Sequence, residues 1–226
     1  KINSLTVKED GDVDTVDITG SVKVDDGKVN EIKEDATTVE VYGGKVGNVE
    51  ADSVIVKDGN VGNMDIDGPV TIEANDEEEA VSIGKIESKG VRATAEDDAK
   101  INIASIKAKD DSNEITLIGN NVNVNSMDLD YREVTVNFGD NEDEYVGTIA
   151  APQNADNAKL IANAEDTDVT VKGAVKAEEI EIDSDAKMSF DSKVTVDTID
   201  GDGVMKINAG NLYVKEGASS VTLKLA

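Results

Sequence analysis

Val39-Glu-Val41-Tyr-Gly-Gly-Lys-Val46-Gly-Asn-Val49-Glu-Ala51-Asp-Ser53 is a compact copy of a unit that the chain repeats. The unit opens with an alternating strand and a turn, and then has an apolar residue, two small or polar residues and a second apolar residue. We call these last four residues the corner phrase. Its copies begin at intervals of 15 to 31 residues and lie at 13–16, 29–32, 46–49, 61–64, 83–86, 103–106, 124–127, 146–149, 177–180 (a weaker copy) and 196–199.

The corner phrase interrupts a strand pattern of period two. Alternation places Val22 and Val24 on one face of a strand and Lys23 on the other. Both apolar ends of a corner phrase must point inward, so its two middle residues have to form a bend, and they are rich in Gly, Asn, Asp, Ser and Thr. We therefore expect coils of three short strands with a tight corner between two of them.

A fixed phrase at a loose period near 20 residues is typical of a solenoid, in which neighbouring coils bury each other's apolar faces. The sequence predicts an all-β fold, a parallel β-helix of about ten coils of roughly 15–22 residues. Residues 1–226 should form a single domain, with an irregular, looped stretch at 150–187. An antiparallel sandwich is the alternative, although a sandwich has no reason to keep the corner phrase. The predicted core contains Val13, Val16, Val46, Val49, Val61, Met64, Ile83, Ile86, Val124, Met127, Val196 and Ile199.

Composition limits the function. The chain has no Cys, His or Trp, and 49 acidic against 22 basic residues give a net charge of −27. This charge repels phosphate backbones and anionic lipid, and no run of 18 apolar residues could cross a membrane. We expect no nucleic-acid partner and no direct membrane insertion.

Enzymatic chemistry has few residues to draw on. Nucleophilic triads that need His or Cys cannot form, and phosphate-binding loops are absent from the sequence. We expect a non-enzymatic protein. A polysaccharide lyase or glycoside hydrolase is the alternative, because carboxylate pairs are plentiful, but Arg92 and Arg132 are the only arginines and aromatic residues are few.

Acidic residues gather in the turns that follow the alternating strands. Equivalent positions of a solenoid stack about 4.8 Å apart, where two carboxylates repel by roughly 0.9 kcal/mol even in water. The turns are either a solvated face or a site for divalent cations, and Ca²⁺ would be the expected cofactor since it accepts clustered carboxylates. The candidate metal ligands of this acidic corner are Asp76, Glu77, Glu78, Glu96, Asp97, Asp98, Asp140, Glu142 and Asp143.

The ends of the sequence also carry an expectation. The chain opens on Lys1 without an initiator Met, as a mature secreted form or an excised piece would. No evident cap precedes the strand at 5–7 or follows the one at 221–225. Flanking segments of a longer chain, or end-to-end stacking of molecules, would cover them.

The acidic, Cys-free, Val-, Asp-, Lys-, Thr- and Gly-rich repeats resemble the bacterial surface-layer and β-helical cell-surface proteins. This resemblance implies a secreted protein at the cell surface or cell wall, structural or adhesive, cation-dependent and self-assembling. Its expected partners are other copies or other cell-surface components, and a glycan is a further candidate. The alternative is a β-helical polysaccharide-binding or polysaccharide-degrading protein.

Overall fold

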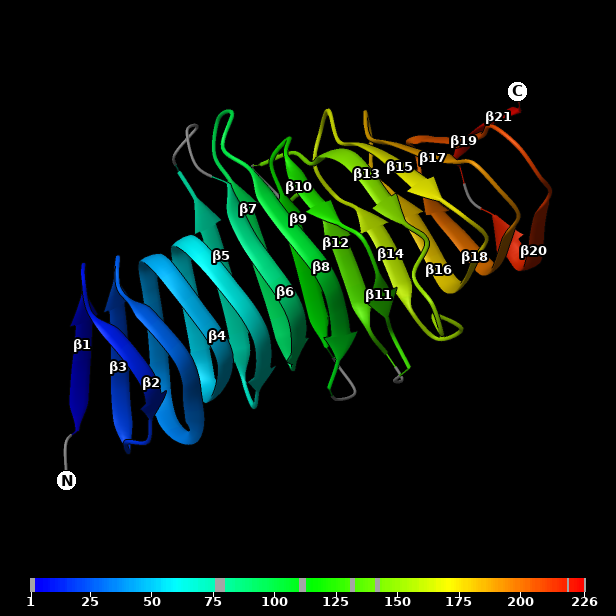
Figure 1. The fold of residues 1–226 in the computed structure, drawn as a ribbon. Helices are drawn as coiled ribbons and strands as arrows, with labels where there is room; N and C mark the ends of the chain where they lie inside the picture. The colour runs from blue at the N-terminus through cyan, green and yellow to red at the C-terminus, as the bar shows by residue number, and fades with distance from the viewer. Residues whose placement is uncertain are drawn as a thin grey trace.

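A computed structural model describes residues 3–75, 80–109, 113–130, 133–140, 143–218 and 220–225. Its strands wind into a parallel β-solenoid of about ten turns, which rises from the N-terminus at one end to the C-terminus at the other (Figure 1). The described part of the chain contains no helix. The predicted fold class is confirmed.

The structure has 21 strands. In chain order they are β1 (Ser4–Lys8), β2 (Asp12–Val16), β3 (Gly20–Asp25), β4 (Lys28–Ile66), β5 (Pro69–Ala74), β6 (Val81–Ser88), β7 (Gly90–Ala95), β8 (Ile101–Ala108), β9 (Glu114–Ile118), β10 (Val122–Val124), β11 (Met127–Asp128), β12 (Thr135–Phe138), β13 (Val146–Ala150), β14 (Lys159–Ala162), β15 (Asp168–Lys172), β16 (Val175–Ile182), β17 (Lys187–Phe190), β18 (Val194–Gly201), β19 (Val204–Ile207), β20 (Leu212–Ala218) and β21 (Thr222–Leu225). The long β4 bends around several coils without losing its pairing (Figure 1).

Two rows of stacked strands extend along the solenoid. The first row holds the alternating strands, and one of its core positions is occupied in successive coils by Val54, Val70, Val91, Ile115, Val136, Leu160, Ile180 and Ile199. The second row holds β2, parts of β4, β6, β8, β10, β13, β15, β17, β19 and β21. Every ladder between these strands is parallel, including that of residues 54–56 with 70–72, so the sandwich alternative is excluded.

The corner phrases stack in phase through the first half of the molecule. Val61 and Met64 lie beside Ile83 and Ile86, and the same pairing carries on to residues 103–106 and 124–127. The phrase at 146–149 breaks the series: Ile149 lies beside Val124, whereas Val146 pairs with Asp168 and is 37% exposed. The reading of 146–149 as a corner in the same series was therefore wrong.

The last two phrases mark a different corner. Ala177 and Ile180 pair with Val196 and Ile199, so these copies are in phase with each other. Ile180, however, stacks on Leu160 in the first row. Any bend whose two flanking residues face inward has the same four-residue pattern, whichever corner of the coil it forms. The phrase at 177–180 belongs to another corner than the earlier phrases, and this explains the long interval before residue 177.

Residues 150–187, expected to be irregular, contain β14, β15 and β16. Residues 151–158 form a loop that remains bonded to the preceding coil. The Gln153 amide donates to the Met127 carbonyl at 2.9 Å, and the Leu129 amide donates to the Gln153 carbonyl at 2.9 Å. The solenoid wall is thus continuous through this stretch.

The core is a column of Val, Ile, Ala and Leu inside the coils. Eleven of the twelve predicted core residues are buried, and Val13, in the first coil, is partly buried. Two aromatic rings, Phe138 and Tyr145, fill the middle of the column with their centroids 5.5 Å apart. The buried Tyr145 hydroxyl donates to the Val122 carbonyl at 3.1 Å, and burial raises the pKa of this phenol well above its usual range.

Candidate functional site

The structure brings part of the predicted acidic corner together. Glu96 and Asp97 follow β7, and Asp143 and Glu144 precede β13; all four line one open groove of about 470 Å³. We call this the acidic groove. It contains three of the predicted metal ligands, Glu96, Asp97 and Asp143, together with Glu144, which the prediction did not include.

Asp140, another of the predicted metal ligands, holds the turn beside the acidic groove. One carboxylate oxygen accepts a hydrogen bond from the Arg92 guanidinium at 2.6 Å, and the other accepts one from the Asp143 backbone amide at 3.0 Å. The ion pair reaches from β7 to the turn after β12, past the intervening strand β9. Asp140 therefore fixes the turn that presents Asp143 to the acidic groove.

Most of the remaining predicted ligands cannot be placed. Asp76, Glu77, Glu78 and Glu142 lie outside the described residues, and Asp98 is exposed without lining the groove. Among the residues that the structure describes, no group of three or more acidic side chains is arranged to hold a metal ion. Calcium binding remains a prediction.

Turn geometry accounts for part of the acidic composition. Five aspartates have a positive backbone φ, which Asp and Asn tolerate better than most residues: Asp10, Asp26, Asp97, Asp166 and Asp185. Asp97, in the acidic groove, has φ 51°. An acidic residue at these positions thus has a conformational reason in addition to any ligand-binding role.

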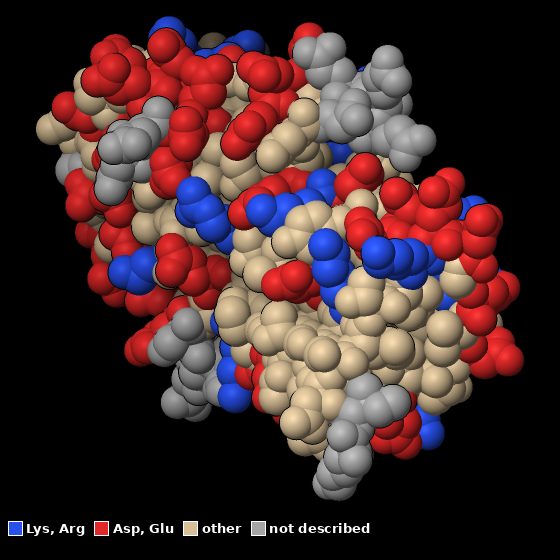
Figure 2. Space-filling model, turned by 90° about the vertical axis from the view of Figure 1, so that its left-hand side faces the viewer, with Lys and Arg blue, Asp and Glu red and all other residues tan. Residues whose placement is uncertain are grey.

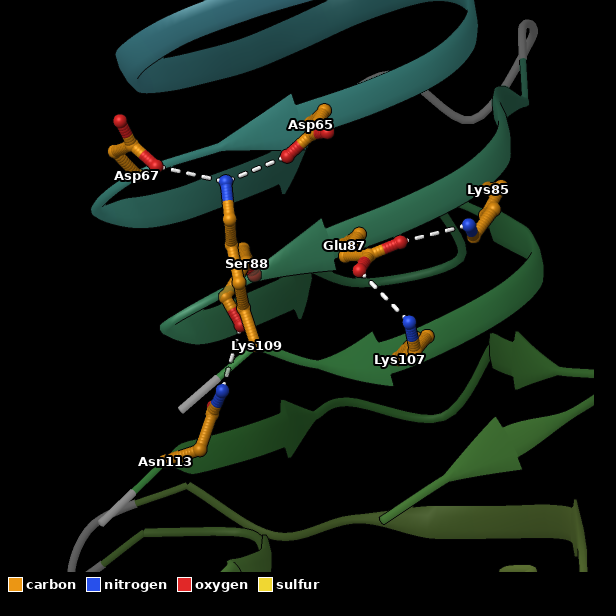
Figure 3. A network of polar contacts seen from close by, with 8 residues as sticks. All are labelled: Asp65, Asp67, Lys85, Glu87, Ser88, Lys107, Lys109 and Asn113. Atoms are coloured by element: carbon orange, nitrogen blue, oxygen red, sulfur yellow. Dashed lines mark hydrogen bonds and ion pairs between the residues drawn. The ribbon is translucent and has the colours of Figure 1, made fainter. Parts of the chain in front are cut away.

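Charged side chains on the second row link one coil to the next (Figure 3). Lys109, just after β8, donates to Asp65 at 2.6 Å and to Asp67 at 2.7 Å. Partial burial opposes the charge of Lys109, but the two carboxylates outweigh it and raise the lysine pKa. The hydrogen bond from Lys109 lowers the pKa of Asp67.

Glu87 on β6 lies at the centre of a second ion-pair group. It accepts hydrogen bonds from Lys107 on the next coil and from Lys85 on its own strand, both at 2.8 Å (Figure 3). These two bonds lower the pKa of the Glu87 carboxyl. Lysines that bridge coils in this way offset the repulsion between stacked acids.

A second groove was not predicted from the sequence. It has a volume of about 750 Å³, and the described residues that line it all have polar side chains: Asn113, Glu114, Glu133, Thr135, Asn137, Lys159, Asn163 and Glu178. We call this the polar groove. The signal that could have revealed it is an asparagine at 113, 137 and 163, one in each of three successive coils of the first row.

The last coil carries an exposed apolar surface. Four of the five exposed large hydrophobic residues of the described chain lie on β20 and β21, namely Tyr213, Val214, Leu223 and Leu225. Leu225 is 78% exposed. Figure 2 shows the opposite, N-terminal end of the molecule, where carboxylates cover much of the visible surface around an uncharged area.

Comparison of the chain with protein-family models, with curated proteins and with solved structures finds no match. No helix long and apolar enough to cross a membrane occurs in the described part. The protein is a parallel β-solenoid, and its candidate sites are the two grooves and the last coil.

Proposed function

We propose that the protein is a non-enzymatic, extracellular structural or adhesive β-solenoid of a surface layer or cell envelope. In this proposal it associates with other copies or with other cell-surface components, and divalent cations promote the association. The observation that carries the proposal is the stack of parallel coils around one apolar column. The apolar residues gathered on the last coil are a candidate contact surface, either for a further segment of the chain or for another protein.

The contacts between stacked coils support a structural role. The ion pair of Glu87 with Lys107 ties neighbouring coils, and Lys109 reaches past one coil to Asp65. A single apolar column extends through the molecule. Stacked repeats of this kind give a stiff rod whose length grows with the number of coils. The acidic turns supply sites where a cation would reduce repulsion between molecules.

The test is the oligomeric state of the protein in chelator, in sodium chloride and in calcium chloride at matched ionic strength. We expect light scattering and negative-stain microscopy to show larger assemblies in calcium. Leu223→Lys should reduce them, because it places a charge in the apolar surface of β21. Val146→Lys is the matched control, since Val146 is exposed on the wall, away from the last coil. A protein that stays monomeric at high concentration in all three conditions would contradict self-association.

Localisation has its own test. We expect antibodies against the protein to label intact cells of the source organism, and we expect the protein in the envelope or culture-medium fraction. Labelling that appears only after the cells are permeabilised would contradict an extracellular protein.

A second function, glycan binding or cleavage, is favoured by the polar groove alone. Incubation with polysaccharides and an assay for new reducing ends separates the two activities. Release of reducing ends would identify an enzyme, whereas binding without release fits the adhesive protein proposed here.

A further inference from the structure

The polar groove lies where the solenoid wall is recessed. Thr116 on β9 and Asn137 on β12 are register partners in positions that alternate with the core, and outward positions of this kind are usually exposed. Both are nevertheless buried, and Asn137 is only 8% exposed. Two of the six buried polar residues of the described chain, Asn113 and Asn137, line the groove. Two more adjoin them: Thr116 is the register partner of Asn137, and the Ser88 carbonyl accepts a hydrogen bond from Asn113.

The hydrogen bonds of the groove leave one buried oxygen without a donor among the described residues. The Asn137 side-chain amide donates to Glu114 at 2.7 Å, and the Asn113 amide donates to the Ser88 carbonyl at 2.6 Å (Figure 3). The Asn113 side-chain oxygen is buried, at a residue 2% exposed, and has no partner. A buried acceptor without a donor destabilises the folded protein, so such atoms are rare and call for an explanation.

The charge of the groove restricts its ligand. Three glutamates, Glu114, Glu133 and Glu178, line it against one lysine. That lysine, Lys159, already pairs with Glu179 at 2.6 Å. The groove therefore offers carboxylate and amide oxygens, and it disfavours an anionic ligand.

The groove follows the axis of the solenoid. Glu114, Thr135 and Lys159 occupy one register position in three successive coils of the first row. Successive coils are about 4.8 Å apart, so polar side chains, although of different kinds, recur at a short, regular spacing. Such a track suits a chain molecule with a repeating polar unit better than a compact ligand.

We propose that the polar groove binds a segment of a neutral or amino-sugar glycan chain, whose hydroxyl or ammonium groups donate hydrogen bonds to the oxygens of Glu114, Thr135 and Asn137. This inference rests on the adhesive form of the proposed function and names the ligand class of that function. Acidic polysaccharides are excluded from the groove by its own carboxylates and by the net charge of −27.

The test is isothermal titration calorimetry of the whole protein with defined tetrasaccharides. The probes are cellotetraose, a glucosamine tetramer and an N-acetylglucosamine tetramer, with tetragalacturonate as the acidic probe. We expect at least one of the first three to bind, and tetragalacturonate not to bind. Glu114→Ala and Thr135→Val should each weaken binding about tenfold, the effect of losing one hydrogen bond that a ligand requires.

Matched controls lie on strands away from the groove. Glu50→Ala removes an exposed glutamate of β4, and Thr71→Val removes a half-buried outward threonine of β5. Both should leave the affinity unchanged. Thermal unfolding of each variant verifies that it is folded, which Glu114→Ala should be because Glu114 is exposed.

Four results would overturn the inference: no binding of the neutral and amino-sugar probes, tighter binding of tetragalacturonate, affinities that Glu114→Ala and Thr135→Val leave unchanged, and binding that chelator abolishes. The calcium-dependent light scattering described above is measured on the same samples. Loss of sugar binding with assembly retained removes the groove inference alone, whereas sugar binding without assembly supports the groove and contradicts self-association.

Discussion

At the scale of single residues, close contact between coils decides which side chains a corner accepts. Gly47, Gly62 and Gly84 hold the second position of three corner phrases. A Cβ on Gly62 would lie 2.4 Å from the Gly47 carbonyl oxygen, and one on Gly84 would lie 2.3 Å from the Gly62 oxygen. The backbone of the preceding coil cannot move away, because its own strand is paired on both sides.

We therefore expect Gly62→Ala to lower the free energy of unfolding by roughly 2 kcal/mol. Gly217→Ala is the control, since nothing lies within 4 Å of the added methyl, and it should change stability by less than about 0.5 kcal/mol. Urea unfolding measures both. Equal stabilities of the two variants would contradict close contact at the corner.

Glu87 gives a prediction about pH. Its pKa in the folded protein lies below the ordinary value of 4.5, because Lys107 and, to a smaller extent, Lys85 donate hydrogen bonds to its carboxylate. The ion pairs of Glu87 therefore stabilise the folded protein fully above pH 4.5, and this stabilisation is lost as the pH falls through the lowered pKa of Glu87 in the folded state. At neutral pH, Glu87→Gln should cost about 1 kcal/mol of unfolding free energy, and the difference from the parent should vanish in acid. Glu50→Gln, at an exposed site on β4, is the control and should change the free energy of unfolding less. If Glu87→Gln lowers the free energy of unfolding equally at all pH values, the ion pairs are not the cause.

At the scale of elements, the alternating strands could be predicted closely from the sequence because alternation reports directly on burial. The strands expected at 5–7 and around Val22 are β1 and β3, and the alternating strand that opens the unit at 39–53 lies within β4. The phrase at 146–149 was misread because four residues specify a bend but not the corner of the coil to which the bend belongs. Register is set by pairing with the neighbouring coil, as Ile149 beside Val124 shows, and that pairing cannot be read from one unit alone.

The stability lost when a core residue is truncated should depend on the coil in which the residue lies. Val13 and Val61 both open a corner phrase, yet Val13 has a neighbouring coil on one side only and is partly buried, whereas Val61 is buried between two coils. Val61→Ala should lower the free energy of unfolding by about 2 kcal/mol, and Val13→Ala by less than about 1 kcal/mol. Chemical denaturation of both variants provides the comparison. A larger cost at Val13 would show that stability is concentrated in the first coil.

At the scale of the whole molecule, the candidate sites were only partly predictable. Acid-rich turns stand out in the sequence, so Glu96, Asp97 and Asp143 could be named before the fold was known, and they do meet in the acidic groove. The ion pair of Arg92 with Asp140 could not be foreseen, since it joins residues 48 apart and depends on how the coils stack. The polar groove could not be predicted for the same reason: its asparagines are far apart in the sequence and line one groove only because successive coils stack.

The net charge of −27 is spread over the entire solenoid, so the stability of the whole molecule should depend on cations. Cations should raise the melting temperature in two separable ways, by screening stacked carboxylates and by binding only the folded state. We expect calcium to raise it above the value in sodium chloride at matched ionic strength, with chelator giving the lowest value. Replacing Glu96 and Asp143 together by their amides should remove the calcium-specific part, whereas the same change at the exposed Glu50 and Asp52 should not. Identical melting temperatures in calcium and in matched sodium would leave screening as the whole effect and would remove the metal-site prediction, because a bound ion that prefers the folded protein must stabilise it.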